Sequence, residues 1–377
     1  MRNITTVDAI VIGAGMAGAS VAYFLSRHAR VLVLEREAYA GMHSTGRSAA
    51  FFSETYGSLQ VRALTRAARP FLERPPASFA AHPLLSPRGS LIVAAAEHEA
   101  QLQANFAALS PYTRDLQLLD GKVIRERVPV LRPEFAACGL LEPRAADIDV
   151  NELHQGYLRG LREHQGQLRV NVDIRFIERD PGHWIVDAGD DVYRAPLLLN
   201  AAGAWVDEVA AMAGVAPLGI EPRRRSAFLF EPPEGVATAQ WPFVTGIDES
   251  FYFKPDAGLL LGSPANADPV TPHDVQPEEL DIALGIYRIE EATTMTIRRP
   301  TRTWAGLRSF VADGDLVGGF AVGVEGFFWV AAQGGYGIQT SAAMGETCAH
   351  LALGLDLPQH LVDAGITAAM LGPQRLR

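Results

Sequence analysis

The chain has 377 residues, of which 48% are hydrophobic and 20% are charged, and its formal net charge is −10 at pH 7. This balance is typical of a folded globular protein of two or three domains and excludes a disordered chain. The acidic charge argues against nucleic acid as the main partner, and no apolar run reaches the roughly 18 residues of a transmembrane helix. Cys138 and Cys348 are far apart and outside any Cys-x-x-Cys spacing. We therefore expect no disulfide framework, no metal site and a cytoplasmic location.

The first forty residues predict a strand, a glycine-rich turn, a helix and a second strand. A short apolar run over 7–12 suits a buried parallel strand, and it is followed directly by Gly13-Ala14-Gly15-Met16-Ala17-Gly18. A helix is expected over 19–27, and a second buried strand over 31–34 ends on Glu35. This is the Gly-x-Gly-x-x-Gly pattern in the strand–turn–helix–strand context of dinucleotide-binding units.

The chemistry of dinucleotide binding explains each position of this motif. Gly13 makes the tight turn, Gly15 lets the backbone approach a pyrophosphate, and Gly18 lets the helix pack closely on the strand. The helix N-terminus offers free N–H groups and the positive end of the helix dipole to phosphate. Glu35 can accept hydrogen bonds from ribose hydroxyls. The sequence therefore predicts a bound dinucleotide rather than an ordinary glycine-rich turn.

Three later segments favour FAD over a nicotinamide cofactor. Residues 41–50 are small and polar, so they can lie against a pyrophosphate and a flavin ring, where a nicotinamide domain would continue with another strand and helix. A strand over 197–200 runs into small residues before a helix over 206–214. A glycine cluster over 334–339 precedes a helix over 340–353, whose N-terminus can stabilise negative charge on the flavin pyrimidine ring. Each cluster alone would indicate a loop, and their order along the chain makes them specific.

On these segments the sequence resembles the D-amino-acid oxidase/glycine oxidase family of FAD amine oxidoreductases, and within it the D-arginine dehydrogenase type. The resemblance covers the whole chain and is also carried by 82–88, 146–149, 153–160, 304–310 and 325–339. It implies an α/β fold in which an FAD-binding Rossmann-like domain of glutathione-reductase type is interleaved with an antiparallel-sheet α+β substrate domain. It divides the chain into FAD-binding pieces at 1–82, 149–217 and 304–377 and substrate-binding pieces at 83–148 and 218–303.

The resemblance also implies which residues contact FAD. They lie in the glycine motif, at the end of the second strand, in the small polar segment, in the middle strand region and in the last glycine cluster: Gly13, Gly15, Ala17, Gly18, Glu35, Arg36, Ser44, Thr45, Gly46, Arg47, Ser48, Ala49, Ala50, Ile174, Ala202, Gly203, Trp205, Gly334, Gly335, Tyr336, Gly337, Ile338 and Gln339. Some relatives attach the flavin through a cysteine upstream of the final glycine motif, and this chain has none there. Non-covalent FAD is therefore expected.

Amino-acid oxidation on a flavin needs the substrate Cα–H held near flavin N5, so the protein must grip the substrate carboxylate. Arginine suits this role because its planar fork binds a carboxylate in bidentate fashion. By resemblance, Arg308 and Arg225 face the flavin and clamp the carboxylate together with Tyr252. The resemblance also places Tyr56 on a short polar loop that covers the active site and touches substrate. The residues alone leave structural alternatives open: ion-paired or surface arginines, and packed or surface tyrosines.

Two positions depart from the D-arginine-selective pattern. Ser90 stands where those enzymes carry a glutamate that pairs with the cationic end of the substrate, and Phe51 stands where they carry a histidine. The pocket is then less anionic and more apolar, which predicts a preference for neutral or apolar D-amino acids over D-arginine. A strong D-arginine preference would require another acid, such as Glu54, to supply the missing charge.

The sequence therefore predicts an FAD-dependent D-amino-acid dehydrogenase that gives a 2-oxo acid and ammonia through an imino acid. Two alternatives stay open, a glycine/sarcosine-type amine oxidase and the flavoprotein subunit of a multi-chain amino-acid dehydrogenase. The expected partners are a small amino-acid substrate and an electron acceptor of unspecified class.

Overall fold

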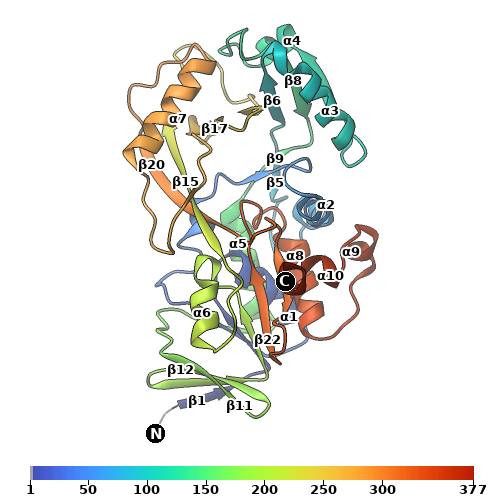
Figure 1. Cartoon of the computed structure of the whole chain (residues 1–377), viewed down its shortest axis with the longest axis vertical. Helices are drawn as coiled ribbons and strands as arrows, with labels where there is room; N and C mark the ends of the chain where they lie inside the picture. Colours follow the sequence, from blue (N-terminus) through green and yellow to red (C-terminus); the bar gives the residue numbers. More distant parts are fainter. Residues whose placement is uncertain (1–2) are drawn as a thin grey trace.

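Two large sheets, one below the other in Figure 1, organise the chain, which the computed structural model describes over residues 3–377. The lower part holds a six-stranded sheet, mostly parallel, in the order β10-β3-β2-β14-β22-β21. The upper part holds a nine-stranded, mostly antiparallel sheet. This is the α/β fold with a second, antiparallel region that the sequence predicts.

The six-stranded sheet is built from short apolar strands that are buried on both faces. Its parallel centre consists of β3 (Val31–Leu34), β2 (Ala9–Ile12), β14 (Leu197–Asn200) and β22 (Phe327–Ala331). The edges are β10 (Gln167–Arg169), parallel to β3, and β21 (Val317–Phe320), antiparallel to β22. Continuous apolar strands of this kind require cover on both sides.

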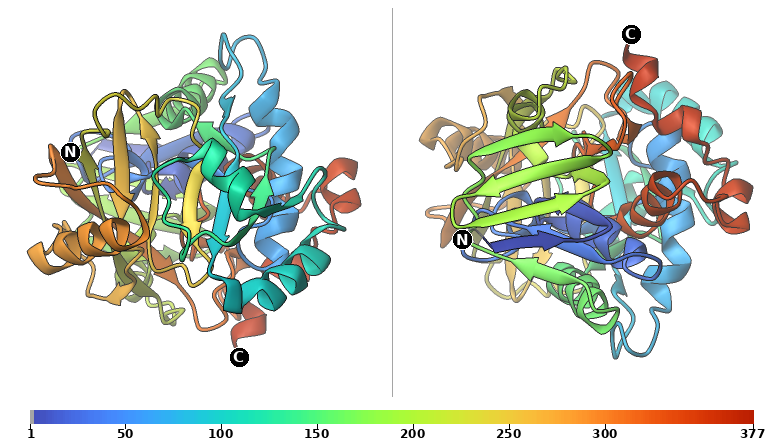
Figure 2. Two further views of the ribbon diagram at one scale, coloured as in Figure 1. Left: turned by 90° about the horizontal axis from the view of Figure 1, so that it is seen from above. Right: turned by 90° about the horizontal axis from the view of Figure 1, so that it is seen from below.

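Helices cover one face of this sheet and a small sheet covers the other. Helix α1 (Met16–Leu25) packs against α5 (Val150–Glu163) and α8 (Ser341–Ala352). On the opposite face lie α6 (Val206–Met212) and a four-stranded sheet of β1 (Asn3–Thr6), β13 (Asp191–Ala195), β12 (His183–Ala188) and β11 (Phe176–Asp180). Figure 2 (right) views the molecule from below and shows this small sheet in front.

The nine-stranded sheet gathers segments from both halves of the chain. Its order is β19 (Asp268–Pro269), β15 (Glu221–Phe230), β18 (Leu259–Ser263), β17 (Tyr252–Asp256), β16 (Phe243–Gly246), β6 (Ser90–Ala94), β8 (Cys138–Glu142) and β7 (Gln117–Asp120), with β20 (Arg302–Phe310) paired to β15. Helices α3 (Glu99–Leu109), α4 (Gly121–Arg127) and α7 (Glu279–Ala292) pack on it. The predicted domain boundary at 304 falls inside β20, so the proposed division stays a prediction.

A small sheet and several short helices connect these regions. The sheet consists of β4 (Phe51–Phe52), β9 (Ala146–Ile148) and β5 (Leu85–Pro87), and β4 leads into α2 (Leu59–Glu73). The C-terminal part adds α9 (Gln359–Asp363) and α10 (Ala368–Leu371). Over residues 3–377, no helix combines the length and apolar character needed to cross a bilayer.

Two predicted strands are shifted in the structure. The sequence predicts strands at 168–172 and 174–178, whereas the structure has β10 at 167–169 and β11 at 176–180. Between them, Asn171 adopts a left-handed backbone with a φ of 55°, and its N–H donates to the carbonyl of Glu37 at 3.0 Å. This turn interrupts the ladder and redirects the chain past the end of β3.

The tightest contact in the glycine motif predicts the effect of one substitution. A Cβ at Gly18 would lie 1.8 Å from the carbonyl oxygen of Gly13, which is backbone and cannot swing aside, whereas a Cβ at Gly15 would meet only Thr45 Oγ1 at 3.4 Å. Overpacking costs about 1–3 kcal/mol. We therefore expect Gly18→Ala to lower the stability of ligand-free protein by about 2 kcal/mol or more in urea unfolding. Gly15→Ala is the control, and equal stability of the two variants would contradict this packing.

Candidate functional site

A cavity of about 400 Å³ opens at the carboxyl ends of the parallel strands and reaches the nine-stranded sheet. At one end its lining includes Gly13, Gly15 and Glu35, and at the other end it includes Arg225, Tyr252 and Arg308. Ligands of open α/β sheets bind in this position, outside the carboxyl ends of the strands. The cavity is therefore the candidate site for both a dinucleotide and the substrate that reacts with it.

The first end is a preformed cradle for a nucleotide. The Glu35 carboxylate accepts hydrogen bonds from the backbone N–H groups of Ala14, at 2.8 Å, and Glu37, at 3.0 Å, which fixes its orientation at the end of β3. The N–H of Met16, at the start of α1, donates to Thr45 Oγ1 at 2.9 Å. Gly15 lines the cavity and has no side chain that would fill it. These residues fit a ribose and a pyrophosphate.

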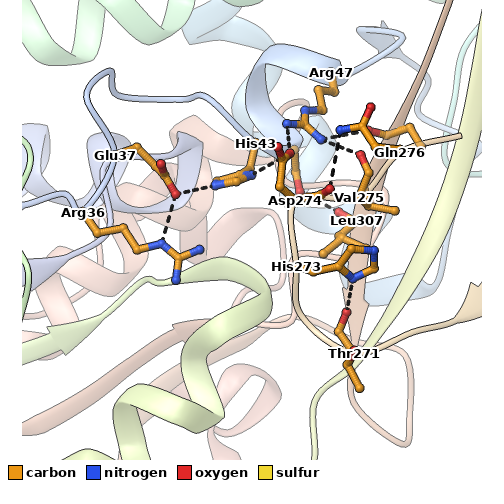
Figure 3. Close-up of polar contacts among 12 residues, drawn as sticks. Arg36, Glu37, His43, Arg47, Thr271, His273, Asp274, Val275, Gln276 and Leu307 are labelled. Atoms are coloured by element: carbon orange, nitrogen blue, oxygen red, sulfur yellow. Dashed lines mark hydrogen bonds and ion pairs between the residues drawn. The ribbon is translucent and has the colours of Figure 1, made fainter.

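Polar contacts hold the segment that flanks this cradle, as Figure 3 shows. Glu37 lies between Arg36 Nε, at 3.1 Å, and His43 Nε2, at 2.8 Å, and the hydrogen bond from His43 lowers the pKa of the Glu37 carboxyl. Arg47 donates to the Val275 carbonyl at 2.8 Å and pairs with Asp274. The Arg47 contacts tie the small polar segment to the substrate side of the molecule.

Most of the predicted FAD contacts line the cavity. They are Gly13, Gly15, Ala17, Glu35, Arg36, Ser44, Thr45, Arg47, Ser48, Ala49, Ile174, Ala202, Gly203, Trp205, Gly334, Gly335, Gly337 and Ile338. The structure places five others outside that lining: Gly18, Gly46, Ala50, Tyr336 and Gln339. Gly18 serves the packing of α1, and Gln339 is buried in a hydrogen-bonded pair with Thr65 at 2.9 Å.

The second end of the cavity holds two arginines with no acidic partner. Arg225 uses its Nε to donate to the Asn266 carbonyl at 2.6 Å, and Arg308 uses one Nη to donate to the Tyr56 hydroxyl at 3.2 Å. No carboxylate in residues 3–377 forms an ion pair with either arginine. The remaining guanidinium donors are therefore available to an anion in the cavity.

Burial and mutual repulsion act on this pair. Burial and then the charge of Arg308 lower the pKa of Arg225. Burial also lowers the pKa of Arg308, but its neighbours Tyr56 and Tyr252 outweigh that effect and raise it. Arginine keeps its proton in proteins, so both charges persist near neutral pH. A bound carboxylate would offset this unfavourable juxtaposition of like charges.

Tyr252 lines this end of the cavity, whereas Tyr56 and Tyr336 lie outside the lining. Tyr252 lines the cavity while its neighbours Phe251 and Phe253 are buried in the core, as strand alternation predicts. The Tyr56 ring lies 5.0 Å from that of Tyr336, between centroids. Burial raises the pKa of Tyr336 to about 12, so this side chain is a neutral phenol at neutral pH. The end of the cavity is thus aromatic and cationic.

Tyr252 is one of three aromatic rings that form a stack. Phe243 lies 4.5 Å from Phe51 and 5.1 Å from Tyr252, between centroids, with interplanar angles of 21° and 25°. Phe51 and Ser90 themselves do not line the cavity, and Ser90 is buried opposite Phe243 in the strand register. Sequence analysis missed Phe243, because only the pairing of β16 with β6 and β17 brings it to this place.

Glu54 is not available to a cationic substrate. Its carboxylate pairs with Arg69 at 2.5 Å and accepts a hydrogen bond from Thr113 Oγ1 at 2.8 Å, and its exposed fraction is 6%. The hypothesis that Glu54 replaces the missing glutamate of D-arginine-selective relatives is therefore wrong. Its charge is already used to hold α2.

Among residues 3–377, neither a cysteine nor a metal-binding group of side chains lines the cavity. Cys348 is fully buried and Cys138 contacts the carbonyls of Ala94 and Ala95. No group of three or more His, Cys, Asp or Glu side chains within that range is arranged to hold a metal ion. The lining combines glycine and other small residues, aliphatic side chains, arginines and a few acidic residues, which suits an organic cofactor.

Comparison with known proteins gives one family and several distant relatives. Residues 8–351 match the family described as FAD dependent oxidoreductase. FAD-dependent oxidoreductase domain-containing protein 1 of Bos taurus is 23% identical, over 92% of this chain and 81% of that protein. Mitochondrial dimethylglycine dehydrogenase of Rattus norvegicus is 24% identical over 68% of this chain but only 30% of its own length. Monomeric sarcosine oxidase of Streptomyces avermitilis is 27% identical over 61% of this chain and 60% of that protein.

The fold is shared with solved structures at low sequence identity. L-proline dehydrogenase from P. horikoshii superimposes with a TM-score of 0.84 at 18% identity, over 100% of this chain and 98% of that chain. At this identity the likeness establishes the fold, including the relative arrangement of the two sheets.

The open surface of Gly15 predicts a separate effect on cofactor binding. Gly15→Ala places a methyl group between the N-terminus of α1 and the space for the pyrophosphate. Such a contact costs about 1–3 kcal/mol, or roughly 5- to 150-fold in Kd. We expect weaker FAD binding in fluorescence titration of the apoprotein, with unchanged unfolding of that apoprotein. An unaltered Kd would show that the pyrophosphate lies elsewhere.

Proposed function

Because this chain belongs to the FAD dependent oxidoreductase family, with FAD as cofactor, we propose that it oxidises the amine of a small amino acid of the glycine or sarcosine type. One observation carries the proposal: Arg225 and Arg308 lie at the far end of the FAD cavity with no acidic partner among residues 3–377. Two unpaired guanidinium groups beside a redox cofactor are suited to the carboxylate of an amino acid.

The chain's own residues bind and orient the substrate. FAD, when bound, supplies the acceptor for the hydride that leaves the substrate carbon. Arg308 and Arg225 hold the carboxylate, and the Tyr56 hydroxyl keeps the Arg308 fork in place through its 3.2 Å hydrogen bond. Tyr252 closes the cavity wall beside them. Fixing the carboxylate in this way orients the neighbouring C–H and amine without any covalent contribution from the protein.

The relatives support the glycine or sarcosine type. Two of them are named for substrates, dimethylglycine and sarcosine, in which a methylated amine lies one carbon from a carboxylate. A carboxylate grip serves such substrates without a charged side-chain pocket. Glu54 is engaged with Arg69, and Ser90 is uncharged, so no acid at these positions selects a cationic side chain.

A second candidate is the oxidation of neutral, apolar D-amino acids. Tyr252, which lines the cavity and stacks on Phe243, favours it, because an apolar side chain gains roughly 25 cal/mol per Å² of surface that it buries. The same carboxylate grip serves this candidate. In both cases we propose that 1–82, 149–217 and 304–377 hold FAD and that 83–148 and 218–303 form the substrate domain.

Anaerobic reduction of the bound flavin distinguishes the two candidates. We expect glycine, sarcosine or N,N-dimethylglycine to bleach the flavin absorbance faster, at equal concentration, than D-leucine or D-phenylalanine. D-arginine should be slow, because Glu54 is paired with Arg69 and Ser90 carries no charge for its side chain. Faster bleaching by D-leucine or D-phenylalanine would favour the second candidate. Bleaching by none of these amino acids would contradict the proposed class.

Removal of one arginine tests the carboxylate grip directly. Arg308→Ala should lower kcat/KM by roughly 100-fold, since a charge-assisted contact contributes up to about 3 kcal/mol. The variant should still load FAD, because Arg308 lies at the substrate end. Arg302→Ala is the matched control, because Arg302 is an exposed arginine on the same strand. Unchanged kcat/KM in flavin-loaded Arg308→Ala would contradict the assignment.

A further inference from the structure

The loop that carries Tyr56 is anchored at its base by buried polar groups. This loop, residues 53–57, connects β4 to α2 and is called the Tyr56 loop below. Ser53 and Glu54 are buried, whereas Tyr56 is half-buried and reaches Arg308. A loop that supplies an active-site group is commonly the most mobile part of that active site. In this protein, the contacts of buried Ser53 and Glu54 indicate that the base of the loop is held in place.

Glu142, the last residue of β8, forms the main anchor. Its carboxylate accepts three hydrogen bonds, from Ser53 Oγ at 2.6 Å, from Thr55 Oγ1 at 2.7 Å and from the Glu54 N–H at 2.7 Å. The side chain is only 2% exposed, and no basic group in residues 3–377 pairs with it. All three of its partners belong to the Tyr56 loop, so this buried carboxylate serves the loop alone.

Two further contacts hold the loop from other directions. Gln339, in the last glycine cluster, accepts a hydrogen bond from the Ser53 N–H at 3.1 Å. Glu54 pairs with Arg69 of α2 and with Thr113. The loop is thus attached to the six-stranded region, to α2 and to the nine-stranded sheet at once. Glu142 and Thr113 attach the loop to the substrate side, and Glu142 contributes three hydrogen bonds.

We propose that Glu142 is a positioning residue, which holds the Tyr56 loop so that the Tyr56 hydroxyl meets Arg308 and sets the guanidinium fork for the substrate carboxylate. This inference rests on the proposed function, because it concerns the same carboxylate grip. Glu142 acts through Tyr56 and does not touch the cavity.

The chemistry of the side chain explains why a carboxylate stands here. Two oxygens that only accept can serve two hydroxyls and one amide N–H together. Burial raises the pKa of Glu142, and the hydrogen bonds from Ser53 and Thr55 oppose that rise. A glutamine keeps one oxygen for the Glu54 N–H, and its NH₂ group can donate to hydroxyls that rotate. A leucine of similar size satisfies none of the three donors.

A double-mutant cycle on the FAD-loaded protein tests the inference, with benzoate as a simple carboxylate probe and calorimetry to measure its Kd. We expect Tyr56→Phe and Glu142→Leu each to raise the Kd by about tenfold. Because both act on one contact, the double variant should bind benzoate no more weakly than Tyr56→Phe alone. Glu142→Gln should recover most of the affinity. The proposal is overturned if the two single effects on the Kd multiply in the double variant, or if Glu142→Leu leaves the Kd unchanged.

Two controls separate positioning from general destabilisation. Leu141→Ala changes the next residue of β8, which packs in the core, and it should lower the melting temperature without raising the benzoate Kd. A matching loss of affinity in this variant would overturn the proposal. If Glu142→Leu does not load FAD, the double variant Ser53→Ala, Thr55→Val removes two of the three donors from the loop side and must also raise the benzoate Kd.

The Arg308→Ala variant separates this inference from the proposed function. If Arg308→Ala leaves the benzoate Kd unchanged, the carboxylate grip itself is wrong. If Arg308→Ala weakens benzoate binding while Glu142→Leu does not, the grip stands and only the role of Glu142 is wrong.

Discussion

Two like charges at one end of a cavity are the constraint on which this site depends. Arg225 and Arg308 repel each other, and burial further disfavours the charge on Arg225. Their arrangement is stable only because tyrosine hydroxyls and the Asn266 carbonyl orient them and because the cavity admits an anion. An acidic side chain would have satisfied both arginines permanently and left no place for a substrate carboxylate. The absence of an acidic partner among residues 3–377 is therefore the feature on which the proposed carboxylate site rests.

The fold brings the two arginines together through one strand pair. Arg225 on β15 and Arg308 on β20 lie on antiparallel neighbours, where Arg225 faces Gly306 in the register. A Cβ at Gly306 would lie 3.5 Å from the Cβ of Arg47, so this glycine lets the small polar segment lie close to β20. The strand β20 then continues toward the last glycine cluster, since Ser309 pairs with Gly334. One strand thus connects the two arginines to the last glycine cluster, and both line the same cavity.

Contacts within one segment were predictable from the residues themselves, whereas the meeting of Arg225, Tyr252 and Arg308 was expected only from the family resemblance and the aromatic stack was missed. The cradle at Gly13, Gly15 and Glu35 follows from a strand, a turn and a helix that are adjacent in sequence, so its geometry was predictable. The aromatic stack depends on Phe243, whose neighbours come from three separate segments. No periodicity in one segment reports such a contact. The hypothesis that Glu54 supplies the missing charge failed for the same reason, because its partner Arg69 lies 15 residues further along the chain.

These differences suggest which parts of the molecule tolerate change. Contacts at the cofactor end join a backbone N–H to a side chain, from Ala14 to Glu35 and from Met16 to Thr45, so one partner of each contact is kept when side chains change. Contacts at the substrate end join side chains from different sheets, as at Tyr56 and Arg308. A change in one of these side chains shifts its partner without disturbing the cradle. On the proposed function, substrate choice would therefore lie in the residues that support Arg225 and Arg308 rather than in the glycine motif.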